Sequence, residues 1–371
     1  MNFKKVALII YLVIIALLFT ASAFCFPEMV RHGYVNCISC HVSPTGGGTL
    51  TPYGRQLSKE ILSQFGKEGE EQFVYGTVTL PEWLLAGGDL RILQLYADNP
   101  SVRQAKYIPM QADLEAAVSY KKVTADATFG PQESPLPTGG FFSRRHYVNY
   151  KPSDSLSFRG GRFFPAYGVN LPDHIPAIKR GLGWDENGET YNIEAAFLGD
   201  EFNFYVTGIF GRPDAQTLNR ETGGAFTGSY AFFDRFKLGA SYYYGTINSN
   251  QRHLLGPWGI LGVTPHLFLL SEVDFQKYQP SDASSGSQTG LAEYQKLDYE
   301  IVQGLHAFIT QEFFQLDFNN SGTIQRIYGL GIQYFPRPHF EIQGVWERQN
   351  VVASFPNNYT DYAWLLFHYY L

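Results

Sequence analysis

From about residue 84 to the end of the chain, apolar and polar residues alternate with a period of two. The segments FKLGASYYYGT (236–246), EFNFYVTGIFG (201–211) and HFEIQGVWE (339–347) each place apolar side chains on one face and mainly polar residues or glycine on the other. Alternating segments of about ten residues that are rich in aromatic side chains and separated by turn residues are typical of outer-membrane barrels. This pattern predicts strands whose apolar face contacts lipid.

The alternating segments number about sixteen, and single-chain bacterial barrels have an even number of strands. We expect the strands near residues 84–96, 107–120, 123–130, 141–150, 155–163, 190–198, 202–211, 224–232, 235–246, 251–261, 265–277, 293–302, 305–317, 323–335, 339–349 and 360–371. Connections after every second strand are tight, and most of the others are longer. The prediction is an all-β fold, a transmembrane antiparallel β-barrel of about 16 strands with both of its ends on the periplasmic side.

The interior of this barrel is expected to be polar. By the predicted register, the charged residues that face the lumen include Asp113, Glu115, Asp126, Arg145, Arg159, Glu272, Asp274, Asp298, Glu300, Glu312 and Glu347. Such charges are normal in a wet interior and do not by themselves mark a site. The longest connection, residues 164–190, either folds into the lumen or forms an external flap. A soluble β-sandwich is the alternative fold, but it would need a polar outer face.

The first 23 residues have the layout of a cleavable secretory signal. Lys4 and Lys5 precede an apolar run, and the small residues 21–23 (Ala-Ser-Ala) follow it. An uncleaved helical anchor is an alternative, although the run is shorter than the ~20 residues that span a bilayer. A lipid anchor on Cys25 is another, although the bulky Phe24 stands where such signals have a small residue. Export, together with the barrel pattern, predicts an outer-membrane protein in contact with lipid.

Composition and charge narrow the class of partners. The chain has 371 residues, of which 16% are aromatic and 37 are glycine, which fits a barrel better than an average cytosolic enzyme. Removal of the signal takes away two lysines, so the formal charge becomes 26 − 34 = −8. A negative balance argues against nucleic acid as a partner.

The sequence Cys37-Ile38-Ser39-Cys40-His41 is the attachment pattern of a c-type haem. Two thiols at this spacing can form thioethers to one porphyrin, and the adjacent histidine can bind its iron. One covalent haem c is therefore the expected cofactor, with Cys37 and Cys40 binding it and His41 as the proximal ligand. An oxidised cysteine pair is a second interpretation. Half of a zinc site is a third, but a second cysteine pair is missing.

The second axial ligand is less defined, because the next methionine after His41 is Met110 and the next histidine is His146. His32 and Met29 precede the motif and are the local candidates, with His32 slightly preferred. A histidine of the barrel or an open position on the iron are the remaining alternatives.

A short amphipathic helix is expected to start at Thr51-Pro52, with Leu57, Ile61, Leu62 and Phe65 on one face and Gly66 as its stop. Residues 24–72 therefore form a small helical c-type haem segment between the signal (1–23) and the barrel (73–371). A segment this small rarely holds a core alone. A barrel of about sixteen strands leaves a channel unless something fills it, so we expect this segment to insert into the lumen.

The motif CISCH followed by TLTPYGRQLSKE resembles the fused cytochrome-porins of iron-oxidising bacteria. In that family a monohaem segment with a similar Leu-Thr-Pro-aromatic-Gly-Arg stretch, here Leu50 to Arg55, precedes an outer-membrane barrel. The resemblance implies that the haem residues are Cys37, Cys40 and His41. It also implies electron transfer across the outer membrane between an extracellular donor or acceptor, such as ferrous iron, and a periplasmic electron carrier.

Three functions follow from these features. The first is the cytochrome-porin fusion, an electron-transfer protein rather than a classical enzyme, with iron oxidation as its expected activity. The second is a solute porin with an N-terminal plug that carries a haem or a disulfide. The third is a haem enzyme such as a peroxidase, which needs an open iron position. The sequence contains no Ser-His-Asp spacing, phosphate-binding loop or HExxH motif.

Overall fold

The structure is a computed structural model that describes residues 28–131, 140–185, 188–215, 220–282, 286–351 and 359–371. The predicted signal peptide (1–23), Cys25 and most of the connection at residues 131–140 lie outside the described residues.

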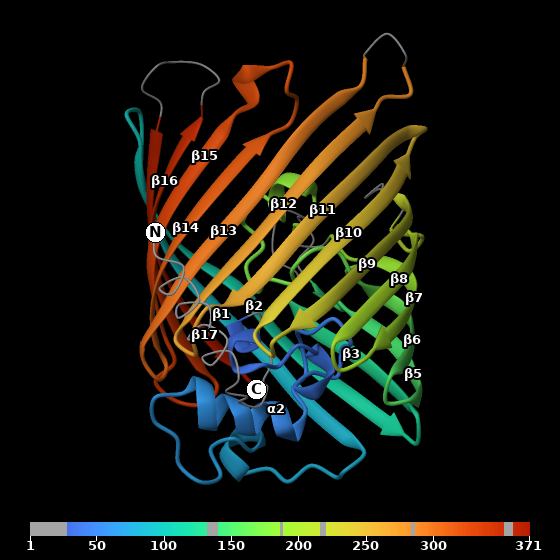
Figure 1. Cartoon of the computed structure of the whole chain (residues 1–371). Helices are drawn as coiled ribbons and strands as arrows, with labels where there is room; N and C mark the ends of the chain where they lie inside the picture. Colours follow the sequence, from blue (N-terminus) through green and yellow to red (C-terminus); the bar gives the residue numbers. More distant parts are fainter. Residues whose placement is uncertain (1–27, 132–139, 186–187, 216–219, 283–285, 352–358) are drawn as a thin grey trace, which may run out of the picture.

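The described strands form one closed antiparallel barrel (Figure 1). Sixteen strands make up the ring, because β1 pairs with both β2 and β17 and each strand between them pairs with its neighbours. Their bounds are β1 Leu84–Asp98, β2 Arg103–Tyr120, β3 Val123–Pro131, β5 His146–Ser153, β6 Leu156–Phe163, β7 Thr190–Leu198, β8 Phe202–Phe210, β9 Thr222–Phe232, β10 Phe236–Ile247, β11 Asn250–Gly262, β12 Leu267–Gln279, β13 Gln288–Val302, β14 Leu305–Gln315, β15 Gln325–Tyr334, β16 Phe340–Val351 and β17 Tyr359–Tyr370. The predicted fold is confirmed.

The fourth predicted strand, residues 141–150, is interrupted. A two-residue strand, β4 (Phe141–Phe142), pairs with the end of β3, and β5 starts only at His146. Between them, the adjacent residues Arg144 and Arg145 both reach inward, to Asp113 at 2.9 Å and to Glu115 at 2.8 Å. Neighbouring residues of a regular strand point to opposite faces, so the break is what lets both guanidinium groups pair inside the barrel.

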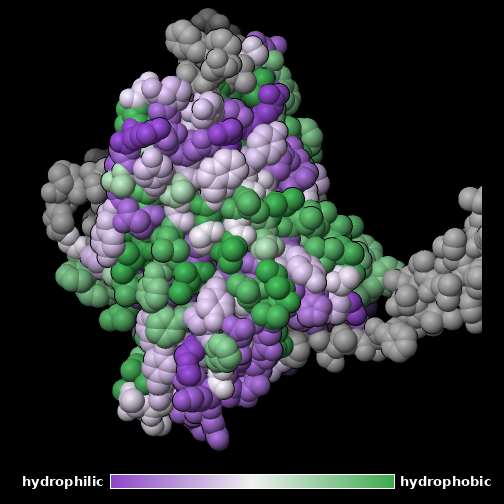
Figure 2. Space-filling view, turned by 90° about the vertical axis from the view of Figure 1, so that its left-hand side faces the viewer, coloured by the Kyte–Doolittle hydropathy of each residue, from purple (hydrophilic) through white to green (hydrophobic). Residues whose placement is uncertain are grey.

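The two faces of the wall differ as the alternation predicts. An apolar band crosses the middle of the outer surface, with polar residues above and below it (Figure 2). Exposed strand residues include Leu114, Phe129, Ile193, Val206, Leu255, Ile309, Leu330 and Leu365. Of the charged residues predicted to face the lumen, all but Arg145 and Glu347 are fully buried, and these two are partly buried. Among the described residues, no helix has the length and apolar character that crossing a bilayer requires.

The N-terminal segment, residues 28–72, lies at the end of the barrel that carries the tight turns (Figure 1). In barrels of this class that end is periplasmic. The segment contains η1 (Glu28–His32), η2 (Cys37–Ser39), α2 (Pro52–Leu57) and a π-helical turn η3 (Ser58–Leu62), and η4 (Phe73–Gly76) follows it. The predicted helix is therefore present but ends at Leu62, and Phe65 is 57% exposed rather than on its buried face.

The long connection between β6 and β7 folds into the lumen, which decides between its two predicted positions. Its described part, residues 164–185, is called the inner loop here and contains η5 (Arg180–Leu182). Tyr167 donates to Asp274 at 2.7 Å, and the backbone N–H groups of Val169 and Ala177 donate to Glu272 and Glu312 at 2.7 Å each. One buried apolar cluster joins the inner loop, the wall and Val30 of the N-terminal segment.

The outer band predicts a specific effect on stability. Leu330 lies in the middle of β15, exposed on the outer face. Leu330→Arg should lower the free energy of unfolding in lipid vesicles by about 2–4 kcal/mol, because it places a charge near the bilayer centre. The control is Val102→Arg in the connection between β1 and β2, where a cost of about 0–1 kcal/mol is expected. Equal effects in a urea titration of the two variants would contradict the placement of the membrane.

Candidate functional site

The cysteine motif forms a single tight turn. The backbone N–H groups of Cys40 and His41 both donate to the carbonyl of Cys37, at 3.2 and 3.0 Å. Cys40 is buried, and Cys37 is half-buried. Ile38, between them, packs against a buried apolar cluster that includes Leu198 and Tyr205 of the wall.

The stretch Leu50 to Arg55 is held directly against this turn. His41 and Leu50 form a β-bridge, and Thr51 donates its N–H to the carbonyl of Cys40 at 2.9 Å. The hydroxyl of Thr51 also accepts from the N–H of Gly54, which caps the start of α2. A side chain at Gly54 would clash with the backbone of Cys40, so the glycine lets the helix rest on the motif.

Three consecutive glycines, residues 46–48, turn the chain between the motif and α2. All three have positive φ values of 84°, 74° and 70°, a region that glycine enters without steric cost. A Cβ on Gly46 would lie 3.3 Å from Cys37 Sγ, so the turn passes close to the first cysteine.

A cavity lies between the motif and the helix. Its unfilled space is about 260 Å³ when its opening to solvent is included, and it is lined by Met29, Cys40, His41, Leu50, Gly54, Leu57, Ser58, Leu62 and Tyr370. Met29 is only 1% exposed and packs in one apolar cluster with Cys40, Leu57 and Leu62. The structure therefore brings Met29 and His41 to the same cavity.

The chemistry of these side chains suits a c-type haem, but the enclosed space between them is too small for one. Burial lowers the pKa of His41 to about 4, so its imidazole is neutral at pH 7, the form that binds metals. The thiols of Cys37 and Cys40 can form the two thioether bonds to a porphyrin, and the thioether of Met29 is a suitable second ligand for its iron. The enclosed space has room for about one water molecule, far less than the ~300–1000 Å³ of most small-molecule sites. A porphyrin therefore requires the surrounding segments to open further than they do here.

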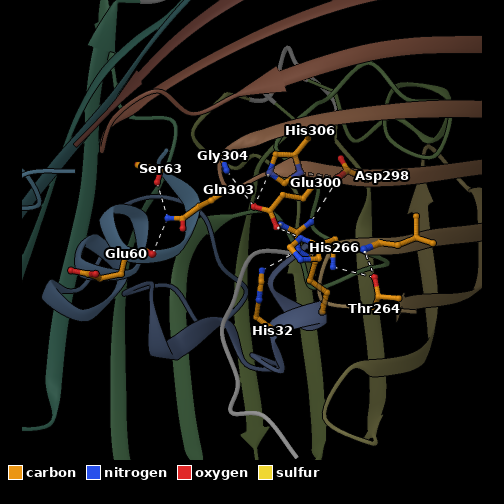
Figure 3. Close-up of polar contacts among 12 residues, drawn as sticks. His32, Glu60, Ser63, Thr264, His266, Asp298, Glu300, Gln303, Gly304 and His306 are labelled. Atoms are coloured by element: carbon orange, nitrogen blue, oxygen red, sulfur yellow. Dashed lines mark hydrogen bonds and ion pairs between the residues drawn. The ribbon is translucent and has the colours of Figure 1, made fainter. Parts of the chain in front are cut away.

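His32 lies at a different place, where the N-terminal segment meets the wall (Figure 3). Its Nε2 accepts from Nε of Arg31 at 3.0 Å, and Arg31 pairs with Asp298 at 3.7 Å and with Glu300 at 3.2 Å. After burial and Arg31, electrostatic interactions with His266, His306 and Arg235 also contribute to lowering the pKa of His32. Unlike Met29, His32 is not among the residues that line the cavity of His41.

Polar contacts fasten the N-terminal segment to the inner wall and its turns. Arg159, which is paired with Glu194 at 2.7 Å, donates to Ser43 at 3.0 Å, and Tyr205 donates to the carbonyl of Pro44 at 3.0 Å. At the opposite side, Gln303 in the turn between β13 and β14 donates to the carbonyls of Glu60 and Ser63 (Figure 3).

The inner loop also reaches the motif. Asn170 donates its side-chain amide to the carbonyl of Thr45 at 2.8 Å, next to the glycine turn. The same amide nitrogen lies 3.5 Å from the position that a Cβ of Gly46 would take. The inner loop thus lies beside the glycine turn, and that turn passes close to Cys37.

Sequence reasoning identified the motif and the Leu50 to Arg55 stretch, and the structure places Leu50 and Gly54 of that stretch in the cavity. It missed Tyr370, whose hydroxyl is 2.8 Å from that of Ser58. Tyr370 was predicted only as part of the last strand, and its distance from the motif in sequence left no signal for a contact with it.

Comparison with known proteins shows the fold. No family model and no curated protein matches the sequence. Among solved structures, a loop L8 deletion mutant of OmpT from Vibrio cholerae has a TM-score of 0.60 at 11% identity, covering 78% of this chain and 99% of that one. OmpF of Salmonella typhi, solved with daunomycin, has a TM-score of 0.58 at 13% identity and covers 78% and 97%. An anion-selective porin from Comamonas acidovorans has 0.55 at 10% identity, covering 78% and 99%.

The class of protein follows from the fold together with its surface. The chain is a porin-like outer-membrane β-barrel with sixteen strands, whose apolar band contacts the membrane lipid.

The position of His32 predicts that the attachment of the N-terminal segment to the barrel depends on pH. Burial, followed by the charge of Arg31, lowers the pKa of His32 from 6.5 to about 4. When the N-terminal segment is bound to the barrel, His32 therefore carries fewer protons than when the segment has come away. Binding of the segment to the barrel is strongest above pH 6.5 and weakens as the pH falls toward 4. Hydrogen exchange of residues 28–36, corrected for the intrinsic rate, should show this loss of protection. His32→Gln keeps an acceptor without titrating and should remove most of the dependence, whereas an unchanged pH profile in this variant would contradict the assignment to His32.

Proposed function

We propose that the protein is an outer-membrane cytochrome-porin fusion, in which one covalent haem carries electrons across the outer membrane. Cys37 and Cys40 would form the thioethers, and His41 would bind the iron. The extracellular partner is a one-electron donor or acceptor, for which ferrous iron is the donor that the family resemblance suggests. The inner partner is a periplasmic electron carrier.

The observation that carries this proposal is the position of the C-x-x-C-H turn in an outer-membrane barrel. A redox cofactor below the membrane could not exchange electrons with an external partner, because the apolar band of such barrels is ~25 Å tall. Contacts of the motif segment with inward-facing Arg159 and Tyr205 support a position inside the periplasmic end of the barrel. Met29 and His41 line one cavity, and together they would hold the iron of a haem that serves electron transfer.

The protein's own residues would set the properties of the site. A bound haem supplies an iron that gains and loses one electron. The neutral imidazole of His41 offers its donor nitrogen, and Met29 offers the sulfur that favours a high potential in cytochromes. Leu50, Leu57 and Leu62 line the space with apolar surface, which excludes water from the iron.

The second candidate is a solute porin whose N-terminal segment is a plug. The porin-like fold supports it. The two candidates differ in the ion conductance that they predict, because a solute porin needs an open path through the lumen. Here the inner loop, the wall and Val30 share one buried apolar cluster. In planar bilayers, the electron-transfer proposal expects little ion conductance from the wild-type protein. A large and steady conductance of the intact chain would favour the porin.

The cofactor proposal is tested on protein purified from the outer membrane of a host that attaches c-type haems. A haem stain after denaturing electrophoresis and a reduced-minus-oxidised spectrum should show one covalent haem. Cys37→Ser with Cys40→Ser should abolish the stain while leaving the barrel folded. Absence of covalent haem in the wild-type protein would overturn the proposal and leave the cysteines as a dithiol or disulfide.

The identity of the second axial ligand of the haem iron is a separate prediction. Because Met29 and His41 line one cavity and His32 is not among its lining residues, Met29→Ala should change the spectrum of the oxidised haem and lower its reduction potential. His32→Ala should leave both close to wild type. The opposite result would assign His32 as the ligand and would require the segment to rearrange when haem is attached.

A further inference from the structure

A group of polar side chains faces outward from the wall on three neighbouring strands, β12, β13 and β14 (Figure 1). Ser271, Gln295 and Gln311 are direct neighbours across the sheet, and Glu293 lies beside Gln295 on the same face of β13. All four are half-buried and alternate along their strands with fully buried residues of the lumen, so their side chains point away from the interior. These four residues are called the outer polar patch here.

The outer polar patch is enclosed by apolar surface instead of lying at the edge of the membrane band. Ile309, the outward-facing residue next to Gln311 on β14, pairs with Leu330 in the middle of β15. The outward-facing residues that flank the patch along its three strands are Leu269, Val273, Leu291, Leu297, Ile309 and Phe313. The patch therefore interrupts the surface that contacts the hydrocarbon of the bilayer.

The chain satisfies only part of the hydrogen-bonding capacity of this patch. The amide of Gln295 donates to the carboxylate of Glu293 at 2.7 Å. The side chains of Ser271 and Gln311 make no hydrogen bond to another residue that the structure describes. Polar side chains in contact with lipid tails are costly unless they find partners. The outer polar patch therefore requires a polar surface opposite to it within the membrane.

The donors and acceptors of the patch fit a second copy of the same surface. A glutamine amide both donates and accepts, as does the hydroxyl of Ser271, whereas the carboxylate of Glu293 accepts. Two identical patches that face each other can therefore pair the donors of each copy with acceptors of the other. A single self-complementary patch leads to a pair with two-fold symmetry, because a ring of three needs two different patches that fit each other.

We propose that the protein forms a two-fold symmetric dimer in the outer membrane, in which the outer polar patches of two copies face each other. The axis passes beside β13, so the rows of Ser271, Gln295 and Gln311 from the two copies meet at Gln295, where side-chain amides bond across the interface. Leu297 and Ile309, exposed beside the row, add apolar contact. Because the interface lies on the outside of the barrel, it is independent of haem and of electron transfer.

The test measures the mass of the full chain in a non-ionic detergent by analytical ultracentrifugation, with the bound detergent subtracted. The wild-type protein should have the mass of two chains. Ser271→Ala combined with Gln295→Leu and Gln311→Leu should weaken the association by about 10-fold or more, because polar side chains that bond within the membrane hold such contacts together. Leucine is the usual kind of residue at a lipid-facing position, so circular dichroism of this triple variant should show a folded barrel.

A control and a second measurement make the result specific. Gln94→Leu removes an exposed glutamine of β1, which lies outside the patch, and should leave the mass at two chains. In intact outer membranes, the photo-crosslinking amino acid p-benzoylphenylalanine in place of Leu297 should link two copies of the chain. The proposal is overturned if the wild-type protein has the mass of one chain or of three, if the triple variant associates as tightly as the wild-type protein, or if the cross-link captures lipid or a different protein instead.

Discussion

Closure of the sheet is the constraint on which the rest of the structure depends. In a bilayer, each backbone N–H and C=O group must find a partner within the protein, and a barrel achieves this only if its first and last strands pair. Here Asp89 to Asp98 of β1 pair with Asp361 to Tyr370 of β17. Sixteen strands enclose a space that the inward side chains alone would leave open, so closure creates an interior to be filled.

The inner loop lies inside that interior and the N-terminal segment lies at its periplasmic end, and each is held by charged side chains of the wall. Arg159 and the Asp298–Glu300 pair hold the N-terminal segment, while Glu272 and Glu312 accept backbone N–H groups of the inner loop. Buried charges are costly without partners. These contacts therefore favour one position of each segment relative to the wall. The proposed haem would then lie in an interior with an apolar cluster, with the barrel separating it from lipid.

Sequence alone predicted the strands well, because lipid outside and polar groups inside impose a period of two that no turn or loop shares. The break before His146 could not be predicted, since it arises from pairing of Arg144 and Arg145 with β2. The inward course of the inner loop was left open because loop sequences carry no periodicity. The positions of Met29 and His32 in the sequence could not decide which of them faces His41, because sequence spacing does not determine which way each side chain points.

We propose that electrons cross the outer membrane through the interior of the filled barrel. This proposal is tested most directly in vesicles that contain the purified protein, with an impermeant one-electron acceptor trapped inside and ferrous iron added outside. The wild-type protein should reduce the trapped acceptor without conducting ions, and the variant with Cys37→Ser and Cys40→Ser should not reduce it. Equal reduction by both proteins, or none by a wild-type protein that carries haem, would contradict the claim.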